Sequence, residues 1–431
     1  MKADLNITFY KEERFKETLI GKIPKDWEVV KIENVIEEVD LRAKTVKNAK
    51  EFPILSLTKN FGLIPQKQRF HKRIATNDIS DYKVVRKGWI VYNPYVIWEG
   101  AICALKDIEV GLVSPVYFVW KPVANTDYRF LDYLFQTEKM LNTFFRFATG
   151  AVQRRRSLKK RDFTRILIPF PSLPEQKAIA HVLSTIDGAI QKTNEIIEKT
   201  KRIKKGLMQE LLTKGIGHKK FKDTEIGRIP KEWKVMKLAD VLELCQYGLS
   251  IKMGDKGKYP IIRMDEIENG YVIPQIAKRV DLDEKTFRAF KLEKGDILFN
   301  RTNSYERVGR TGIFLLDGNY VFASYLIRLR VKRNIVDPHF LTFYMIFSHD
   351  RLRQLATKAV HQANINATNL KKFKIPLPPL DEQQKIAEIL LIVDKRLEVE
   401  RKRKERLERI KKSLMDLLLT GKIRVKVVKH D

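Results

Sequence analysis

The most regular pattern of apolar positions lies in two long segments, residues 174–214 and 381–420. In each segment, apolar residues, or polar residues that a coiled-coil seam can accept, recur at spacings that alternate between four and three. This is the heptad pattern of a coiled coil. The first seam consists of Ile179, Leu183, Ile186, Ile190, Thr193, Ile197, Thr200, Lys204, Leu207 and Leu211. The second consists of Ile386, Leu390, Val393, Leu397, Glu400, Lys404, Leu407, Lys411, Leu414 and Leu418. Both seams are apolar at their ends and polar in the middle.

Helices of this length need a partner. A helix of about 40 residues spans about 60 Å, which is too long for packing on a single domain. We therefore expect the two helices to pair with each other in antiparallel orientation, with a globular domain at each end of the pair. The alternative is two independent amphipathic helices, each lying on its own domain.

The rest of the chain has a different texture. Short runs rich in β-branched and aromatic residues, such as WIVYN, VYFVW, DILFN and YLIRLRV, are separated by Gly, Pro, Asn and Asp. Helical stretches at residues 130–147 and 338–357 are mixed with them. This pattern predicts α+β domains built on antiparallel strands.

The chain also repeats itself. IGKIPKDW at residues 20–27 matches IGRIPKEW at 226–233, and KGWIVYN, ending at Asn93, matches KGDILFN, ending at Asn300. IPFPSLPEQKAIAHVL, from Ile168, matches IPLPPLDEQQKIAEIL, from Ile375. Between these blocks the two copies share almost nothing. A duplicated frame with two unlike inserts predicts one architecture that presents two different binding surfaces.

The repeat and the two helices divide the chain into six parts. We expect an N-terminal extension (1–17), a first globular domain (18–170), a central helix (171–215), a second globular domain (216–377), a distal helix (378–424) and a C-terminal tail (425–431).

The charge indicates a polyanionic partner. The chain has 84 Lys and Arg against 53 Asp and Glu, a net charge of +31. Nucleic acid is the first candidate and an anionic membrane surface the second. No apolar run is long enough for a spanning helix, and the first residues lack a signal-peptide core. The two cysteines, Cys103 and Cys245, read as thiols, so we expect a cytoplasmic protein.

Motifs for catalysis are weak. The chain has neither the glycine-rich dinucleotide motif nor the P-loop motif. Residues 93–95, Asn-Pro-Tyr, resemble the Asn-Pro-Pro-Tyr element of adenine methyltransferases, but one proline is missing and the copy at 300–302 is Asn-Arg-Thr. Residues 175–177, Glu-Gln-Lys, resemble the end of a nuclease motif, yet a place in the first turn of a helix explains Glu175 better. We expect no catalytic residue, no metal site and no cofactor on this chain.

Basic and polar clusters are the remaining candidates. RRRSLKKR, at 154–161, suits phosphate contact, although a solvated loop is the alternative. The segment after Asn300 has the Arg and Asn side chains that read guanine and adenine edges. The candidate DNA-contact residues are Lys67, Arg69, His71, Lys72, Arg73, Asn93, Arg154, Arg155, Arg156, Lys159, Lys160, Arg161, Arg263, Asn300, Arg301, Thr302, Asn303, Ser304, Arg307 and Arg310. Basic runs at 199–205 and 401–412 suit an exposed coiled-coil face, a DNA-tracking strip or an acidic partner.

The doubled motifs resemble those of a known family. IGKIPKDWEVVKI with its copy IGRIPKEWKVMKL, and LPEQKAIAHVL with LDEQQKIAEIL, are similar to the repeated signatures of specificity subunits of type I restriction-modification systems. The resemblance implies two target-recognition domains separated by two antiparallel helices. Each domain would bind one half of a bipartite double-stranded DNA target, and the helices would set the spacing.

The resemblance also implies partners. Two methyltransferase subunits using S-adenosylmethionine would dock on the linker helices, at residues 174–213 and 381–420. Restriction subunits that use ATP and Mg²⁺ to translocate DNA would join them, with one copy of this chain in each complex and no membrane involved. It makes Asn300 and Arg301 better candidates for DNA contact than Asn93. A stand-alone two-site DNA-binding scaffold or regulator and a single-chain nuclease are the alternatives.

Overall fold

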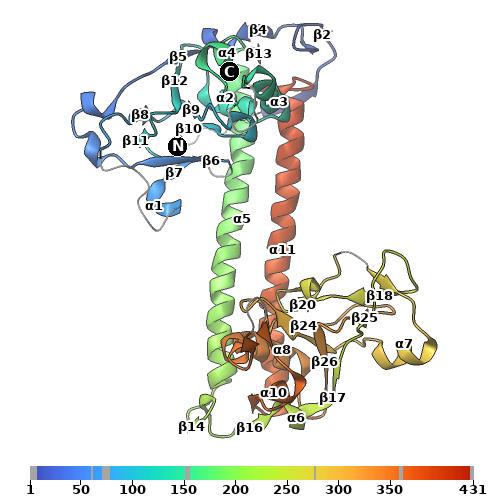
Figure 1. Ribbon diagram of the computed structural model, residues 1–431. Helices are drawn as coiled ribbons and strands as arrows, with labels where there is room; N and C mark the ends of the chain where they lie inside the picture. Colours follow the sequence, from blue (N-terminus) through green and yellow to red (C-terminus); the bar gives the residue numbers. More distant parts are fainter. Residues whose placement is uncertain are drawn as a thin grey trace. The chain divides into compact units, whose positions relative to one another are not determined.

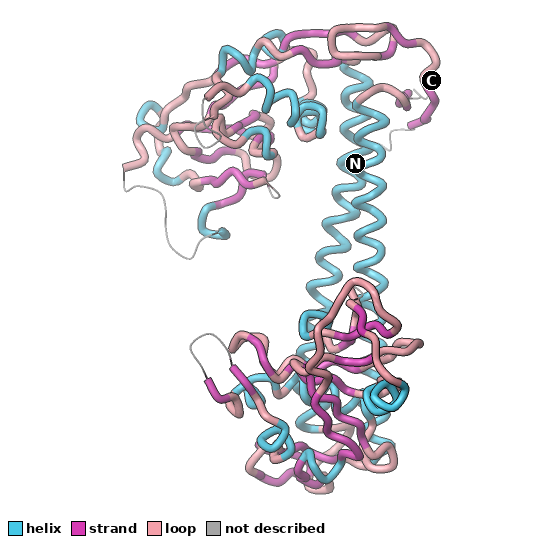
Figure 2. The backbone as a smooth tube through the Cα atoms, turned by 45° about the vertical axis from the view of Figure 1, so that its right-hand side comes forward, coloured by secondary structure: helices cyan, strands magenta, loops and turns pink. Residues whose placement is uncertain are grey.

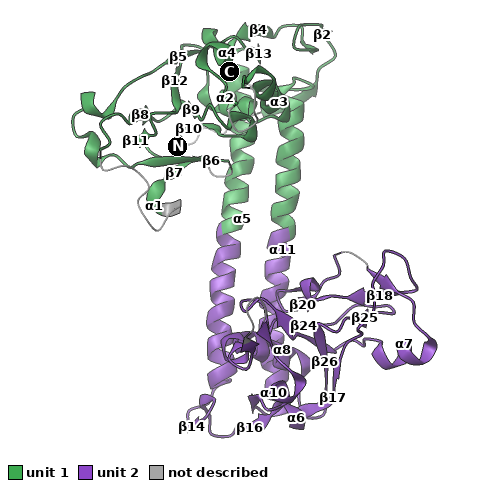
Figure 3. Cartoon of the chain, viewed as in Figure 1, with its two compact units in different colours: residues 1–194, 402–431 green, residues 195–401 purple. Residues whose placement is uncertain are grey.

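The chain forms two compact units. The computed structural model describes residues 7–59, 62–69, 78–150, 156–275, 278–358 and 363–427. Unit 1 contains residues 1–194 and 402–431, and unit 2 contains residues 195–401 (Figure 3). Two long helices, α5 (Leu173–Lys214) and α11 (Leu380–Leu419), labelled in Figure 1, each contribute about one half to each unit (Figure 3). The unit boundaries therefore fall inside both predicted helices rather than at their ends.

The two helices pack together within each unit, as Figures 1 and 2 both show. In unit 1, Asp187 Oδ1 on α5 lies 2.6 Å from Lys411 Nζ on α11, and in unit 2, Lys204 Nζ on α5 lies 2.5 Å from Asp394 Oδ1 on α11. Residue numbers rise along one helix as they fall along the other, so the pairing is antiparallel. Every predicted seam position is buried or half-buried. The predicted helix pair is confirmed, and the alternative of two independent helices is wrong.

Unit 1 has a small antiparallel sheet at its centre. The sheet has the order β10 (Ile102–Ala104), β9 (Ile90–Tyr92), β12 (Phe118–Pro122) and β5 (Ile36–Glu38). Unit 1 also contains two-stranded pairs: β11 (Val110–Val113) with β8 (Lys83–Arg86), β13 (Leu167–Phe170) with β4 (Glu28–Lys31), β6 (Leu55–Thr58) with β7 (Gly62–Pro65), and β2 (Phe15–Lys16) with β3 (Ile23–Pro24). The short helices are α1 (Gln66–Arg69) and α4 (Lys160–Thr164).

Unit 2 has a larger sheet. Its order is β17 (Leu242–Tyr247), β26 (Leu326–Val331), β22 (Ile297–Asn300), β24 (Thr311–Ile313), β20 (Tyr271–Val272) and β19 (Ile267–Glu268). One three-stranded sheet has the order β21 (Arg279–Val280), β18 (Tyr259–Ile262) and β25 (Val321–Phe322). Another has the order β23 (Thr302–Asn303), β28 (Ala363–Asn364) and β27 (Thr357–Lys358). Two further pairs are β16 (Lys234–Lys237) with β29 (Lys374–Leu377), and β14 (Phe221–Thr224) with β15 (Gly227–Pro230). Unit 2 also contains the short helices α6 (Leu238–Val241), α7 (Glu284–Phe290) and α10 (Ala367–Lys371). The predicted antiparallel pairing holds except where β18 meets β25 and β20 meets β24, which are parallel.

Each predicted helical stretch of the globular domains is two helices. In unit 1, α2 (Tyr128–Phe135) ends before α3 (Glu138–Phe147), and in unit 2, α8 (Pro338–Phe347) ends before α9 (His349–Arg353). The break before α3 occurs because the Thr137 hydroxyl accepts a hydrogen bond from Met140 N, which makes Thr137 an N-cap.

The first and last described strands pair with each other in unit 1. Strand β1 (Ile7–Lys11) lies antiparallel to β30 (Ile423–Val427). Residues 7–11 of the predicted extension and residues 425–427 of the predicted tail therefore lie in one two-stranded sheet.

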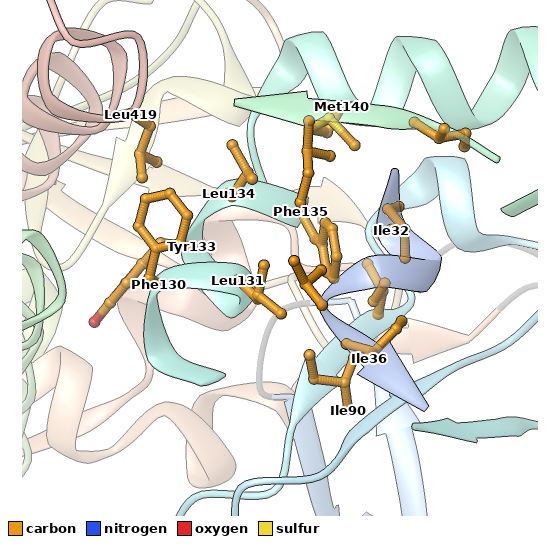
Figure 4. Close-up of a cluster of buried hydrophobic side chains, with 14 of the residues drawn as sticks. Ile32, Ile36, Ile90, Phe130, Leu131, Tyr133, Leu134, Phe135, Met140 and Leu419 are labelled. Carbon is orange, nitrogen blue, oxygen red and sulfur yellow. The ribbon is translucent and has the colours of Figure 1, made fainter. Parts of the chain in front are cut away.

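The core of unit 1 joins its globular domain to both long helices. Phe130, Leu131 and Phe135 of α2 pack with Ile32 and Ile36, as Figure 4 shows. The same cluster includes the seam residues Ile179, Leu183 and Leu418, together with the neighbouring Leu419. The corresponding cluster of unit 2 includes Trp233, Leu211, Ile386 and Leu390. Each globular domain is therefore anchored on the helix pair.

Candidate nucleic-acid interface

The repeated motifs meet in a buried hydrogen bond that occurs once in each unit. Trp27 Nε1 donates to Glu175 Oε2 at 3.0 Å, and Trp233 Nε1 donates to Glu382 Oε2 at 3.0 Å. Both tryptophans are buried. Glu175 was expected only to face the helix dipole, but it is also a buried acceptor that holds the tryptophan of the repeated motif.

The glutamines that follow these two glutamates bind the start of a helix in each globular domain. Gln176 Oε1 accepts from Asp127 N at 2.9 Å, and Gln383 Oε1 accepts from Asp337 N at 2.9 Å. Asp127 and Asp337 are the N-caps of α2 and α8. The doubled Glu-Gln therefore attaches each long helix to its own globular domain, which is a structural role rather than a nuclease role.

A third repeated contact was missed by sequence reasoning. The Tyr133 hydroxyl donates to Asp187 Oδ2 at 2.7 Å in unit 1, and the Tyr271 hydroxyl donates to Asp394 Oδ2 at 3.1 Å in unit 2. These aspartates occupy matching positions of the repeat and also bind the seam lysines. Identical Asp and Lys at matching helix positions were the signal that could have revealed them.

The fourth contact differs between the units. Glu175 also binds Arg424, with Oε1 2.5 Å from Nε, whereas Glu382 binds His218 Nε2 at 2.9 Å. Arg424 further contacts Asp26 and Glu12, at 2.8 and 2.5 Å. The hydrogen bond from Arg424 lowers the pKa of Asp26. The glutamate that accepts from the tryptophan is thus also bound by a guanidinium in unit 1 and by an imidazole in unit 2.

Four candidate DNA residues of unit 1 are exposed, and five others lie outside the described part. Lys67, Lys159 and Arg161 are exposed, and Arg69 ends α1. Lys160 forms an exposed ion pair with Glu38 at 2.8 Å. The residues outside the described ranges are His71, Lys72, Arg73, Arg154 and Arg155.

Two further candidates of unit 1 make internal contacts. The Arg156 guanidinium lies 4.5 Å from the centroid of the Phe145 ring. Asn93 Oδ1 accepts from Tyr95 N at 3.1 Å. Asn93 therefore shapes the turn that follows β9.

In unit 2, the first two candidates make contacts inside the protein. Asn300 is fully buried and its Nδ2 donates to Met264 O at 3.3 Å. Arg301 stacks on Tyr247, with 4.8 Å between guanidinium and ring centroid. A base contact by Asn300 would require its turn to open, so the placement does not favour the two candidates that the resemblance placed above Asn93, and their DNA role stays a prediction.

The remaining candidates of unit 2 surround this turn. Arg263 forms an ion pair with Asp265 at 3.0 Å. Thr302, Asn303 and Ser304 are half-buried, whereas Arg307 and Arg310 are exposed.

Comparison with known proteins identifies the family. The model of the type I restriction modification DNA specificity domain matches residues 24–202 and again residues 230–409. The chain belongs to this family. The chain is thus a specificity subunit with two tandem target-recognition domains, as the doubled motifs predicted, and not one of the catalytic subunits.

Full-length relatives carry the same description. A putative type I restriction enzyme MjaX specificity subunit from Methanocaldococcus jannaschii is 32% identical over 97% of this chain and 99% of its own length. The EcoKI specificity subunit of Escherichia coli is 23% identical over 85% of this chain and 82% of its own.

Solved structures share the fold. A type I restriction-modification S subunit from M. genitalium has a TM-score of 0.57 at 14% identity, covering 94% of this chain and 99% of that one. A chain from a study of complex assembly in a type I system has a TM-score of 0.55 at 17% identity, covering 93% and 99%.

The helices of this specificity subunit carry a duplicated surface. Residues 202–205 and 409–412 have the same sequence, Arg-Ile-Lys-Lys. The lysine at the third position forms the seam ion pair described above, while Ile203 and Ile410 are 57% and 42% exposed. Two charged helices therefore carry an exposed isoleucine at matching positions of the repeat.

Three sequence expectations concerned absences. Among the described residues, no group of three His, Cys, Asp or Glu side chains is placed to hold a metal ion. No helix in the described ranges is both long and apolar enough to cross a membrane. Cys103 and Cys245 are unpaired thiols, and burial raises the pKa of both.

Proposed function

We propose that this specificity subunit binds a bipartite double-stranded DNA target, with one half-site read by each recognition domain. The observation that carries the proposal is a repeated framework with unlike inserts. The Trp–Glu, Gln–Asp and Tyr–Asp contacts occur once in each unit, whereas the segments between the repeated motifs share almost no sequence. Two copies of one frame with different surfaces suit two different half-sites.

The net charge supports DNA as the ligand. A surplus of +31 provides cations for phosphate contacts on both domains. Affinity should then fall linearly with salt concentration on a double logarithmic scale, because each phosphate contact releases condensed counterions. Phosphate contacts position the protein, and the sequence choice rests on fewer side chains that reach base edges.

The helix pair supports a fixed gap between half-sites. Helices α5 and α11 have 42 and 40 residues. We propose that their length sets the gap, because a reader with two half-sites recognises the spacing imposed by its own frame. One heptad is about 10.5 Å, or about three base pairs of B-DNA.

The duplicated helix surface supports docking of two copies of one partner. We define the docking face as Lys199, Ile203 and Gly206 in unit 2, and as Arg406, Ile410 and Ser413 in unit 1. All six residues are exposed, and the spacing of i, i+4 and i+7 places each set on one face of its helix. A cation, an exposed isoleucine and a small residue suit a partner helix with acidic and apolar side chains.

Gly206 strengthens this reading. A glycine inside a helix costs about 1 kcal/mol relative to alanine. A Cβ atom at Gly206 would meet nothing within 4 Å in the described part of the chain, so internal packing does not require this glycine. A partner helix that approaches closely would.

We assign catalysis to the partners. Two methyltransferase subunits would occupy the two docking faces and use S-adenosylmethionine, and restriction subunits would use ATP and Mg²⁺. The methyltransferase must also flip the target adenine out of the stack, because the atom it modifies is inaccessible inside a duplex. One copy of the specificity subunit in each cytoplasmic complex satisfies this arrangement.

Genome-wide mapping of adenine methylation tests the DNA proposal. Cells that carry the gene together with the gene of its methyltransferase partner should show a methylated motif with two specific halves and a fixed gap. Deleting the gene should abolish methylation of that motif. Unchanged methylation after deletion would contradict the proposal.

Substitution of the exposed isoleucines tests the docking proposal. We expect Ile203→Asp and Ile410→Asp each to remove one methyltransferase copy in native mass spectrometry, and the double variant to remove both. The matched control is Ile392→Asp, because Ile392 is 62% exposed on α11 but its counterpart in the repeat is Thr185. Retention of both copies by the double variant would overturn the docking face, and DNA binding without any methyltransferase would favour a stand-alone scaffold.

A further inference from the structure

The two recognition domains present different turns at the same place in the repeated frame. Strand β9 leads directly to Asn93, and β22 ends at Asn300, its counterpart. Asn93 N donates to Ala101 O at 3.0 Å, and Asn300 N donates to Arg310 O at 2.8 Å. Each asparagine therefore closes a turn that leaves a central strand, and the two turns can be compared directly.

The chemistry of the two turns differs. Between Asn93 and Ala101, the exposed side chains are Tyr95 and Glu99. Between Asn300 and Arg310, the exposed side chains are Glu306, Arg307 and Arg310 itself. Only the turn of unit 2 presents guanidinium groups.

The turn of unit 2 is fixed at several points. Gly309 N donates to Asn300 O at 2.8 Å, and Val308 N donates to Ser304 O at 2.9 Å. His349 Nε2, on α9, lies 2.9 Å from Val308 O. The backbone that carries Arg307 and Arg310 is thus held in place before any ligand binds.

Arg301 contributes to this fixation rather than to a surface. Its guanidinium donates to Ser324 O and to Asn364 Oδ1, both at 3.3 Å, while it stacks on Tyr247. These contacts occupy the flat face and both terminal nitrogens. Arg301 is a positioning residue that braces the start of the turn.

Arg307 and Arg310 are free by comparison. Neither side chain forms an ion pair or a hydrogen bond with another residue in the described ranges, and both are exposed. Glu306 lies exposed beside Arg307. A carboxylate in this position repels phosphates but accepts a hydrogen bond from cytosine N4, so the set suits a base edge better than the DNA backbone.

We propose that Arg307 and Arg310 read guanine in the half-site bound by the second recognition domain. The inference rests on the proposed function and adds the side chains that choose the sequence. A guanidinium binds guanine O6 and N7 with two hydrogen bonds, and a fixed backbone lowers the entropy lost when these bonds form. The first recognition domain has no cation in the matching turn, so it reads its half-site by other side chains.

Selection from a library of random-sequence duplexes tests this inference. The probe is the library itself, bound by the full chain with any subunits that co-purify, and the bound duplexes are sequenced. Wild type should enrich a motif with two halves. Arg307→Ala or Arg310→Ala should lower the preference for guanine at one position of one half by about 5- to 150-fold. The other half should stay unchanged.

Arg288→Ala is the matched control. Arg288 lies on α7 in the same unit, its side chain is 78% exposed, and it pairs only with the nearby Glu284 in the described residues. It should leave the motif unchanged, and equal melting temperatures would show that all three variants fold.

The outcomes separate the inference from the function beneath it. If wild type enriches no motif with two halves, the proposed function is wrong. If wild type enriches the motif but both arginine variants keep every guanine preference, the inference is overturned. A uniform loss of affinity without loss of preference would also overturn it, because that result assigns the two arginines to phosphates.

Discussion

The contacts of Arg424 lead us to expect that the pairing of β1 with β30 stabilises unit 1. Its side chain is 5% exposed on β30 and contacts Glu175, Asp26 and Glu12. Arg424→Met keeps most of the side-chain length but removes the cation. Glu175, whose side chain is 8% exposed, then keeps only the hydrogen bond from Trp27 among the contacts described here.

The expected loss follows from this geometry. Removing one partner of a buried ion pair costs about 3–5 kcal/mol, because the other charge stays buried. The side chain of Asp26 is 68% exposed and regains water, and Trp27 still donates to Glu175. We therefore expect the lower end, about 3 kcal/mol, which lowers the melting temperature of a unit of this size by about 6–12 °C.

Scanning calorimetry measures the effect. Lys426→Met is the control, because Lys426 is exposed on the same strand. Arg424→Lys should fall between wild type and Arg424→Met, since an ammonium cannot reproduce the fork that contacts three carboxylates. Equal melting temperatures for Arg424→Met and Lys426→Met would refute the reasoning.

The same cluster predicts a pH dependence. Because the hydrogen bond from Arg424 lowers the folded-state pKa of Asp26, its stabilisation is present above the unfolded pKa of about 4 and is lost as the pH falls through the folded pKa. The difference in melting temperature between wild type and Arg424→Met should therefore narrow below about pH 4. A constant difference across this range would mean that the carboxylates contribute little.

Three further predictions follow from the helices and the charge. Deleting seven residues from both α5 and α11 should shorten the gap between methylated half-sites by about three base pairs, whereas deleting them from one helix alone should destroy the pairing. Glu400→Leu should raise the melting temperature of unit 2, because Glu400 is 1% exposed in the seam and its Oε2 has no hydrogen-bond partner in the described structure. Finally, the affinity measured by titration at increasing salt should fall steeply for any sequence, while the ratio between target and non-target duplexes should change much less.

The sequence predicted the local features well. Heptad spacing is a property of one segment, so the seam from Ile179 to Leu211 could be read without knowing its partner. The doubled motifs also revealed the two domains. Short strands such as β1 and β30 carry no such information, because five alternating residues do not specify a pairing partner.

Several contacts between residues far apart in the chain could not be predicted from the sequence. Tyr133 lies on α2 and Tyr271 on β20, so no common sequence position marks the two hydroxyls that bind Asp187 and Asp394. Composition likewise made Arg301 and Arg307 equal candidates. Only the fold distinguishes them, because it places Tyr247, from a distant strand, against Arg301.

A domain exchange tests the central claim most directly. Residues 18–170 are replaced by the corresponding recognition domain of another specificity subunit, the gene is expressed with its methyltransferase partner, and adenine methylation is mapped across the genome. We predict that one half of the methylated motif changes while the other half and the gap stay the same. A change in both halves, or in neither, would contradict an account in which each unit reads its own half-site.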